Sequence, residues 1–198
     1  MNLHSLLCSF LAILLLGGGV AGCSQQAADP PLKGASIGGP LNLINQDGQR
    51  ISDSSFAGKY RLVYFGFANC PDVCPVDLAV LGAGLRQFEA EDRARAERVQ
   101  PIFITVDPRR DTPQVLKRYV ANFHPRLIGL TGSEQEIQQV VTAHGGSALP
   151  DEPNEAGGYN VNHTRFLLLM GPDNAPIAIV PHDEGAEGLA RALDQWVR

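Results

Sequence analysis

The sequence predicts an α/β domain in which a mixed sheet lies between two layers of helices. Two observations support this prediction. Apolar runs typical of buried strands alternate with segments of helical periodicity up to about residue 144, and two further apolar runs joined by a short turn precede a last helical segment. The chain has 198 residues, 44% of them hydrophobic and 19% charged, which is enough for one such domain and a short extra piece.

The extra piece lies at the N-terminus and predicts export. Residues 6–16 form an almost unbroken apolar run, and small residues lead from there to Cys23. The sequence Val-Ala-Gly-Cys at residues 20–23 resembles a bacterial lipobox. We therefore expect residues 1–22 to be a lipoprotein signal peptide and Cys23 to be lipidated, on an exported, membrane-anchored protein of the periplasmic side. An uncleaved anchor and a soluble secreted form are the alternatives.

Charge and cysteine content exclude two classes of protein. The formal net charge is −5 at pH 7 and Lys and Arg form no block, so we expect no nucleic acid partner. Of the four cysteines, Cys8 lies in the predicted signal and Cys23 at the lipobox. Only Cys70 and Cys74 remain for the domain, too few for a disulfide framework.

Residues 23–40 are expected to form the lipidated cysteine and a flexible linker, because they are rich in Ala, Pro, Gly and Ser without an apolar period. The domain is predicted to span residues 41–198. It begins with a hairpin, since residues 41–44 and 50–52 flank an Asp-Gly pair, which is a strong turn signal.

Strands and helices then alternate. The predicted strands are residues 61–67, 99–106, 127–130, 166–170 and 177–180. Helices are predicted to begin near residues 75, 112 and 133, and a last helix is predicted to turn Leu189, Leu193 and Trp196 toward the core. Thr112 before Pro113, and Ser133 with Glu136, are capping signals for two of these helices. Residues 145–162 show no usable periodicity, so they predict a long loop with a functional role. This order of elements suits a thioredoxin-like fold.

The residues with evident chemistry are Cys70 and Cys74, which follow the predicted central strand at the entry to a helix. Ligands gather beyond the carboxyl ends of strands, and a helix start favours an anionic sulfur, so we expect a thiolate near neutral pH. Cysteines four residues apart on one helix face can both bind one ion, and soft thiolates select Cu(I), zinc or iron–sulfur centres.

His163 is the candidate third ligand, because it shortly precedes the predicted strand 166–170. In thioredoxin-like proteins this position faces the cysteine motif and usually holds a cis-proline, which this sequence lacks. Asp107 follows the predicted strand 99–106 at the same sheet edge, so it either supports the site or supplies charge for a turn and the start of the next helix. His124, His144 and His182 have no ligand-like spacing and are interpreted as structural.

Other interpretations of the cysteine pair stay open. The two cysteines could form a disulfide that staples the first helical turn, or a redox pair without metal. A peroxide-reducing thioredoxin relative is a third alternative, but the residues before Cys70 do not supply that family's Thr-x-x-Cys setting.

Four motifs carry a resemblance to a known family. They are Val-Tyr-Phe-Gly-Phe before Cys-Pro-Asp-Val-Cys-Pro at residues 63–75, Thr-Val-Asp-Pro-Arg-Arg-Asp-Thr-Pro at 105–113, Gly-Leu-Thr-Gly at 129–132 and Tyr-Asn-Val-Asn-His-Thr at 159–164. Together they resemble the Sco/SenC family of copper chaperones, from about residue 41 to the C-terminus. One departure is Asn162, where the family commonly has Asp before the histidine.

The resemblance implies a thioredoxin-like fold and copper, as Cu(I) and also as Cu(II), held by Cys70, Cys74 and His163. It implies the same two cysteines as a redox disulfide. Asp107 and Asn162 are the candidates for residues that support the ligands. The implied client is the copper-site subunit of cytochrome c oxidase or another exported cuproprotein. The rival function is a thiol-disulfide oxidoreductase that reduces the client's cysteines and itself needs a thiol reductant.

Overall fold

The structure is a computed structural model that describes residues 28–198. The predicted signal peptide, residues 1–22, and the predicted lipidation site Cys23 lie outside the described residues. Within the described part of the chain, no helix combines the length and the apolar character needed to cross a bilayer.

The N-terminal hairpin forms as the Asp-Gly signal predicts. β1 (Asn42–Asn45) pairs antiparallel with β2 (Arg50–Ser52), and a short 3-10 helix, η1 (Asp53–Phe56), follows. Gly48 has a φ of +78°, a conformation that L side chains rarely adopt. The Asn45 side chain closes the turn by accepting hydrogen bonds from the backbone N–H groups of Asp47 and Gln49, each at 2.9 Å.

A seven-stranded mixed sheet runs through the domain in the order β2-β1-β5-β4-β3-β8-β9. Its remaining strands are β3 (Tyr60–Gly66), β4 (Val99–Thr105), β5 (Ile128–Thr131), β8 (Leu167–Met170) and β9 (Pro176–Val180). β3 lies parallel to β4 and antiparallel to β8, and β8 is antiparallel to β9. Every residue of β3 is buried, as expected for a central strand covered on both faces.

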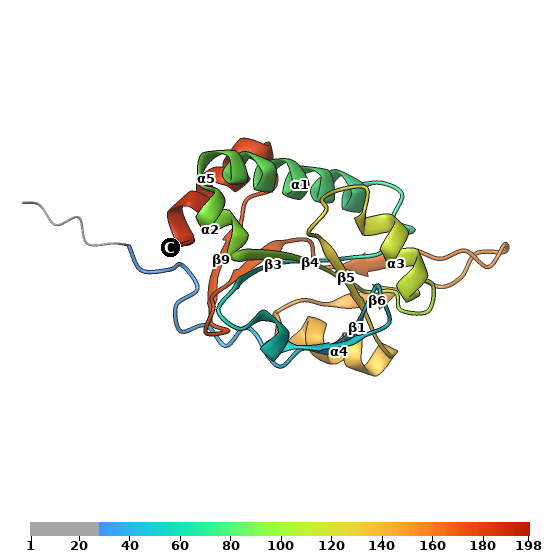
Figure 1. Cartoon of the computed structure of the whole chain (residues 1–198). Helices are drawn as coiled ribbons and strands as arrows, with labels where there is room; N and C mark the ends of the chain where they lie inside the picture. The colour runs from blue at the N-terminus through green and yellow to red at the C-terminus, as the bar shows by residue number, and fades with distance from the viewer. Residues whose placement is uncertain (1–27) are drawn as a thin grey trace, which may run out of the picture.

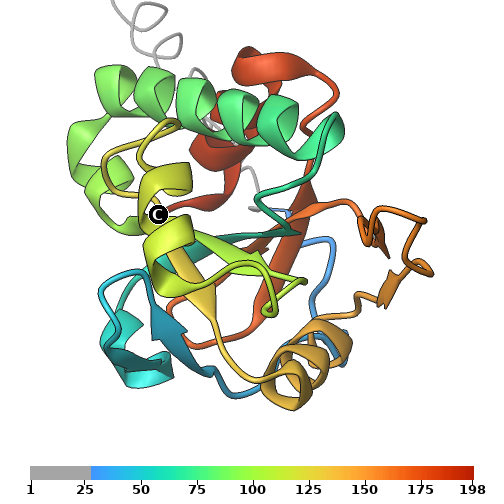
Figure 2. The same ribbon diagram turned by 90° about the vertical axis from the view of Figure 1, so that its right-hand side faces the viewer.

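Helices cover both faces of this sheet, which gives the three predicted layers (Figures 1 and 2). The helices are α1 (Val73–Glu91), α2 (Arg93–Glu97), α3 (Pro113–Val120), α4 (Glu134–Ala143) and α5 (Gly185–Trp196). α4 lies on the opposite face from α1 and α5 (Figure 1). Thr112 caps α3 and Ser133 caps α4, as the sequence predicts.

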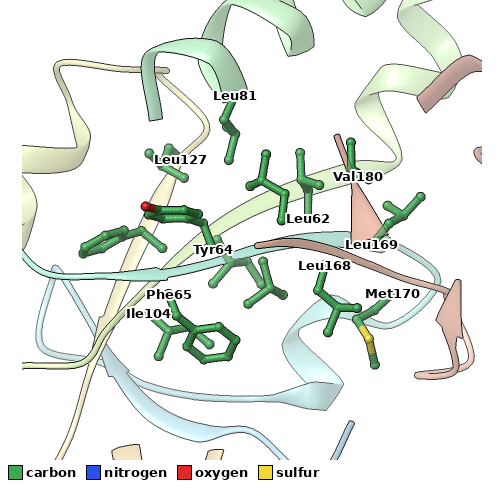
Figure 3. Close-up of a cluster of buried hydrophobic side chains, with 14 of the residues drawn as sticks. Leu62, Tyr64, Phe65, Leu81, Ile104, Leu127, Leu168, Leu169, Met170 and Val180 are labelled. Atoms are coloured by element: carbon green, nitrogen blue, oxygen red, sulfur yellow. The ribbon is translucent and has the colours of Figure 1, made fainter. Parts of the chain in front are cut away.

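Side chains from β3 alternate between the two halves of the core. Figure 3 shows Leu62 and Tyr64 on the side of α1, near Leu81, and Phe65 on the other side, near Ile104. Tyr64 and Phe65 are 0% and 2% exposed, so the strand that leads to the cysteine motif is fixed by packing on both faces. These elements together form a thioredoxin-like α/β fold.

The long loop predicted at residues 145–162 contains structure that the sequence did not indicate. β6 (Ala148–Pro150) and β7 (Val161–His163) form a separate two-stranded antiparallel sheet in which Ala148 pairs with His163. Strands of three residues are too short to show an alternating pattern, so the prediction of an irregular loop was wrong at both ends of this segment. His163 is therefore the last residue of a strand.

The described part of the predicted linker packs on the domain. The Leu32 N–H donates to the Ile177 carbonyl at 3.0 Å and the Gly38 N–H donates to the Ala143 carbonyl at 2.7 Å. Leu32 and Ile37 also pack against the core. Residues 30–39 are thus not free of the domain, and these contacts argue for a domain that starts before residue 41.

Candidate metal centre

The structure brings the two cysteines and the histidine together at the carboxyl end of β3. Cys70 lies in the loop after β3, Cys74 lies in the first turn of α1, and His163 ends β7. The Cys74 Sγ is 3.6 Å from the His163 Nε2, although the two residues are 89 positions apart in the chain. The Cys74 backbone N–H donates to the Cys70 Sγ at 3.4 Å, and both cysteines carry free thiols.

The separation of Cys74 and His163 suits two ligands of one ion. Metal–sulfur bonds of about 2.3 Å and metal–nitrogen bonds of about 2.0–2.1 Å place S and N roughly 3.5–3.8 Å apart at bond angles of about 109–120°. Within residues 28–198, no group of three His, Cys, Asp or Glu side chains is already arranged around one point. The site is thus a Cys74–His163 pair with the Cys70 sulfur against the amide of Cys74.

Cys74 is fully buried, which changes its acidity. Burial raises the pKa of Cys74 to about 12, and a hydrogen bond with the Cys70 thiol acts in the same direction. The expectation that the helix start yields a thiolate near neutral pH is therefore wrong for Cys74, because desolvation outweighs the helix dipole. Cys74 is a neutral thiol until an ion displaces its proton.

Gly66 allows this burial. A Cβ at Gly66 would lie 3.0 Å from the Cys74 Sγ, 2.9 Å from the Tyr64 ring and 3.1 Å from the Phe103 ring. The last residue of β3 therefore has to be glycine for the sulfur to occupy its present place.

The surroundings of His163 favour the neutral imidazole, which is the form that can bind a metal ion. Burial lowers its pKa, so the uncharged imidazole dominates near neutral pH. Its Nδ1 lies 3.1 Å from the Thr164 carbonyl oxygen, and an Nδ1–H that donates there leaves the Nε2 lone pair facing Cys74. The Phe67 ring packs edge-on against the imidazole, with ring centroids 6.0 Å apart.

Asp107 lies near the site but acts through its neighbours. Its buried carboxylate accepts a hydrogen bond from the Tyr159 hydroxyl at 2.8 Å and forms an ion pair with Arg110. The Arg110 guanidinium lies 3.8 Å above the centroid of the Tyr159 ring and 5.7 Å from that of Phe67. Asp107 thereby anchors the segment that leads into β7.

Asn162 points away from the candidate ligands. Consecutive residues of a strand face opposite sides, so its side chain lies on the other side of β7 from the imidazole of His163. Its amide Nδ2 donates to the Asp151 carboxylate at 2.5 Å, across the hairpin. The contacts of Asn162 thus stabilise the hairpin instead of the imidazole.

A charged cluster beneath Cys74 was missed by sequence reasoning. Asp77 is 1% exposed, and its carboxylate accepts hydrogen bonds from the Arg165 guanidinium at 2.6 and 2.5 Å and from the Tyr64 hydroxyl at 2.9 Å. His182 joins this cluster, with its Nε2 3.9 Å from the same carboxylate. An acidic residue on the apolar face of a predicted helix, one turn after Cys74, was the available signal.

The two other histidines within residues 28–198 have no contact with the cysteines, as interpreted from the sequence. His144 is buried at the C-terminal end of α4, with its Nδ1 2.7 Å from the Val140 carbonyl oxygen. His124 accepts a hydrogen bond from the Arg126 N–H at 3.2 Å, and its Nε2 lies 3.5 Å from Glu89. The contacts of His144 stabilise the end of α4, and those of His124 stabilise the connection between α3 and β5.

Comparison with known proteins identifies a family whose members are similar to this chain. Residues 29–198 match the family model described as SCO1/SenC. The chain is 42% identical over 139 residues to a protein named SCO1 homolog 1, mitochondrial, from Arabidopsis thaliana, a match that covers 70% of this chain and 40% of the relative. The chain spans between 40% and 60% of the length of such curated relatives.

Solved structures resemble most of the described domain. Arabidopsis thaliana ScoI with copper bound matches with a TM-score of 0.74 and 36% identity, covering 80% of this chain and 97% of that one. A structure of BsSco, described as having a disulfide switch and as a member of the Sco family of cytochrome c oxidase assembly proteins, matches with a TM-score of 0.66 and 28% identity. It covers 86% of this chain and 97% of the other.

Proposed function

We propose that this chain, which belongs to the SCO1/SenC family, is a copper chaperone that delivers copper to the binuclear copper site of cytochrome c oxidase and helps to assemble it. Two kinds of finding support the proposal. Similar proteins have been solved with copper bound, and one relative is described as a cytochrome c oxidase assembly protein. Copper is the cargo of this function, and the client is the subunit that carries the oxidase copper site, or another exported cuproprotein.

The observation that carries the proposal is the 3.6 Å contact between the Cys74 sulfur and the His163 Nε2, with the Cys70 sulfur beside them. Two thiolates and one neutral imidazole are a soft ligand set, which favours Cu(I) over hard cations and also accepts Cu(II). We assign Cys70, Cys74 and His163 as the ligands. Cys70 is partly exposed, so its side chain has room to turn from the Cys74 amide toward the ion.

Transfer to a client follows from the unequal burial of these ligands. Cys74 is buried, whereas Cys70 and His163 are partly exposed and can be replaced from the solvent side. His163 also sits on a hairpin that is not part of the main sheet. Client ligands therefore replace His163 and Cys70 first, and Cys74 releases the ion last.

The experiment that tests the ligand set is a copper titration of His163→Ala beside Asn162→Ala. Both variants shorten a side chain of β7, but only His163 faces Cys74. We expect His163→Ala to bind Cu(I) more weakly and Asn162→Ala to bind it as the parent does. Equal affinity in His163→Ala and the parent would remove His163 from the ligand set.

A thiol-disulfide oxidoreductase that reduces the cysteines of the same client is the second candidate. It is favoured by the two adjacent free thiols and by the disulfide switch described for BsSco. In this reaction Cys70 and Cys74 lose two electrons and two protons to form one disulfide, and a client disulfide gains them. An external thiol reductant then restores the pair. Reductase activity that survives in His163→Ala but not in Cys70→Ser would favour this candidate.

We further propose that the protein is an exported lipoprotein anchored through Cys23 on the periplasmic side. The support is the apolar run of residues 6–16 and the Val-Ala-Gly-Cys sequence that ends at residue 23. Mass spectrometry of the mature protein tests it. We expect an N-terminal lipidated Cys23, and a full-length unmodified chain would contradict the anchor.

A further inference from the structure

The hairpin that carries His163 depends on side-chain contacts for its position. β6 and β7 form a two-stranded sheet of their own, separate from the seven-stranded sheet. An isolated hairpin is marginally stable in water, so its own hydrogen bonds do not fix where it stands relative to α1. In Figure 2 the segment extends from the side of the domain. Burial of Val161 in the core holds one end of β7, and the distance between His163 and Cys74 then depends on the contacts that follow His163.

Arg165 makes the contact that joins the two ligand-bearing segments. It follows His163 by two residues, and its Nε and Nη2 donate to the Asp77 carboxylate at 2.6 and 2.5 Å. Asp77 follows Cys74 by three residues on α1. This ion pair therefore ties the chain next to one candidate ligand to the helix turn next to the other.

The position of Asp77 makes this tie specific. Its carboxylate is 1% exposed and also accepts a hydrogen bond from the Tyr64 hydroxyl at 2.9 Å. A buried carboxylate without a cation is strongly unfavourable, so Asp77 holds the guanidinium of Arg165 in place. Two parallel N–H···O bonds also fix the direction of the guanidinium, which a single charge contact would not do.

We infer that Arg165 is a positioning residue of the copper site. Its ion pair with Asp77 holds the His163 imidazole at ligand distance from the Cys74 sulfur and thereby slows the release of the ion. Arg165 itself touches no candidate ligand ring or sulfur in the contacts described for residues 28–198; it acts through His163. This inference rests on the proposed function, because it concerns the same copper.

The test is a double-mutant cycle on the full-length chain in detergent. Cys8→Ser and Cys23→Ser are present in all proteins, so that Cys70 and Cys74 are the remaining thiols. Cu(I) affinity is measured by competition with a chromophoric chelator, and release is followed after the chelator is added in excess. We expect Arg165→Gln to lower the affinity about 10-fold or more, the range seen when groups that orient a metal ligand are lost. In a His163→Ala background, Arg165→Gln should cause no further loss.

Two more variants separate positioning from folding. Arg165→Lys keeps a cation beside Asp77 but loses the two parallel hydrogen bonds of the guanidinium. It should therefore fold and bind copper with an affinity between those of the parent and Arg165→Gln. Arg93→Gln is the control, because Arg93 also forms an exposed ion pair, with Glu97 at 2.9 Å, on α2, which follows the end of α1 opposite to Cys74. It should leave copper affinity unchanged.

Three results would overturn the inference. The first is an Arg165→Gln variant that binds and releases copper as the parent does. If Arg165→Gln does not fold, the second is an Arg165→Lys variant with the copper affinity and release rate of the parent. The third is an equal loss from Arg165→Gln with and without His163, since that loss would come from general destabilisation. Parental affinity in His163→Ala would instead overturn the ligand set and this inference with it, so the two failures are distinguishable.

Discussion

The burial of Cys74 makes copper binding depend on pH in a defined way. Burial and the Cys70 thiol raise the pKa of Cys74 to about 12, and burial lowers the pKa of His163. Between about pH 7 and about pH 10, Cys74 is therefore protonated and His163 is neutral. A copper–thiolate bond at Cys74 forms only when its proton leaves. This one proton makes the affinity rise with pH by a factor of about ten per unit, or about 1.4 kcal/mol, in addition to any rise that comes from Cys70 as a second thiol ligand.

The variant Cys70→Ser isolates this proton. A thiol with an ordinary pKa of about 8.5 would already be ionised above about pH 9, and its affinity would stop rising there. With the raised pKa of Cys74, affinity should instead rise roughly 100-fold in total between about pH 8.5 and about pH 10.5. The assay is Cu(I) competition with a chelator of known protonation behaviour, in the Cys8→Ser and Cys23→Ser background.

Two further measurements check the same reasoning. Alkylation of Cys74 in Cys70→Ser should accelerate across the same pH range, because the thiolate is the nucleophile. His163→Ala should bind more weakly but keep the same dependence on pH, since a neutral imidazole contributes no proton. An affinity that levels off near pH 9 in Cys70→Ser would refute the account of Cys74 as a buried neutral thiol.

Three other perturbations have expected outcomes. Gly66→Ala places a Cβ 3.0 Å from the Cys74 sulfur and should destabilise the domain by about 1–3 kcal/mol in urea unfolding; unchanged stability would contradict the packing described. Tyr159→Phe removes the hydroxyl that donates to the buried carboxylate of Asp107, so the free energy of unfolding should fall by about 1–2 kcal/mol and hydrogen exchange in the β6–β7 hairpin should become faster. Unaltered exchange would argue against anchoring of the hairpin through this bond. Asn162→Asp replaces a hydrogen bond across the hairpin by repulsion of two carboxylates, so it should loosen the hairpin but lower copper affinity by less than about 10-fold; a larger loss would show that this side chain supports the imidazole.

Most of the fold could be predicted because its elements carry strong local signals. The apolar run of β3 and the capping residues Thr112 and Ser133 gave correct strand and helix assignments, with bounds shifted by one or two residues at most of the ends. The β6–β7 sheet was missed since three-residue strands carry no usable period. The packing of residues 30–39 was missed because their few apolar residues, such as Leu32 and Ile37, form no pattern.

The candidate site, like the fold, could be predicted from the sequence only in part. Cys70, Cys74 and His163 could be chosen from residue type and from their places beside predicted strand ends, and the structure brings them together. The acidity of Cys74 could not be predicted, because it depends on how deeply the first turn of α1 is buried.

The neighbours of the ligands are set by tertiary contacts. Asp77 and Arg165 are 88 residues apart in the chain, so their pairing follows from the register of β8 against β3 and the packing of α1. The side of β7 on which Asn162 lies depends on the hairpin register, which is equally long-range in origin.

The most direct test of the proposed centre is X-ray absorption spectroscopy of the copper-loaded protein, with His163→Ala measured beside it. The account predicts two sulfur ligands and one imidazole nitrogen in the parent, and loss of the nitrogen signal in the variant. A copper environment that contains no imidazole in the parent, or that is the same in both proteins, would contradict the assignment of Cys70, Cys74 and His163 as the copper ligands.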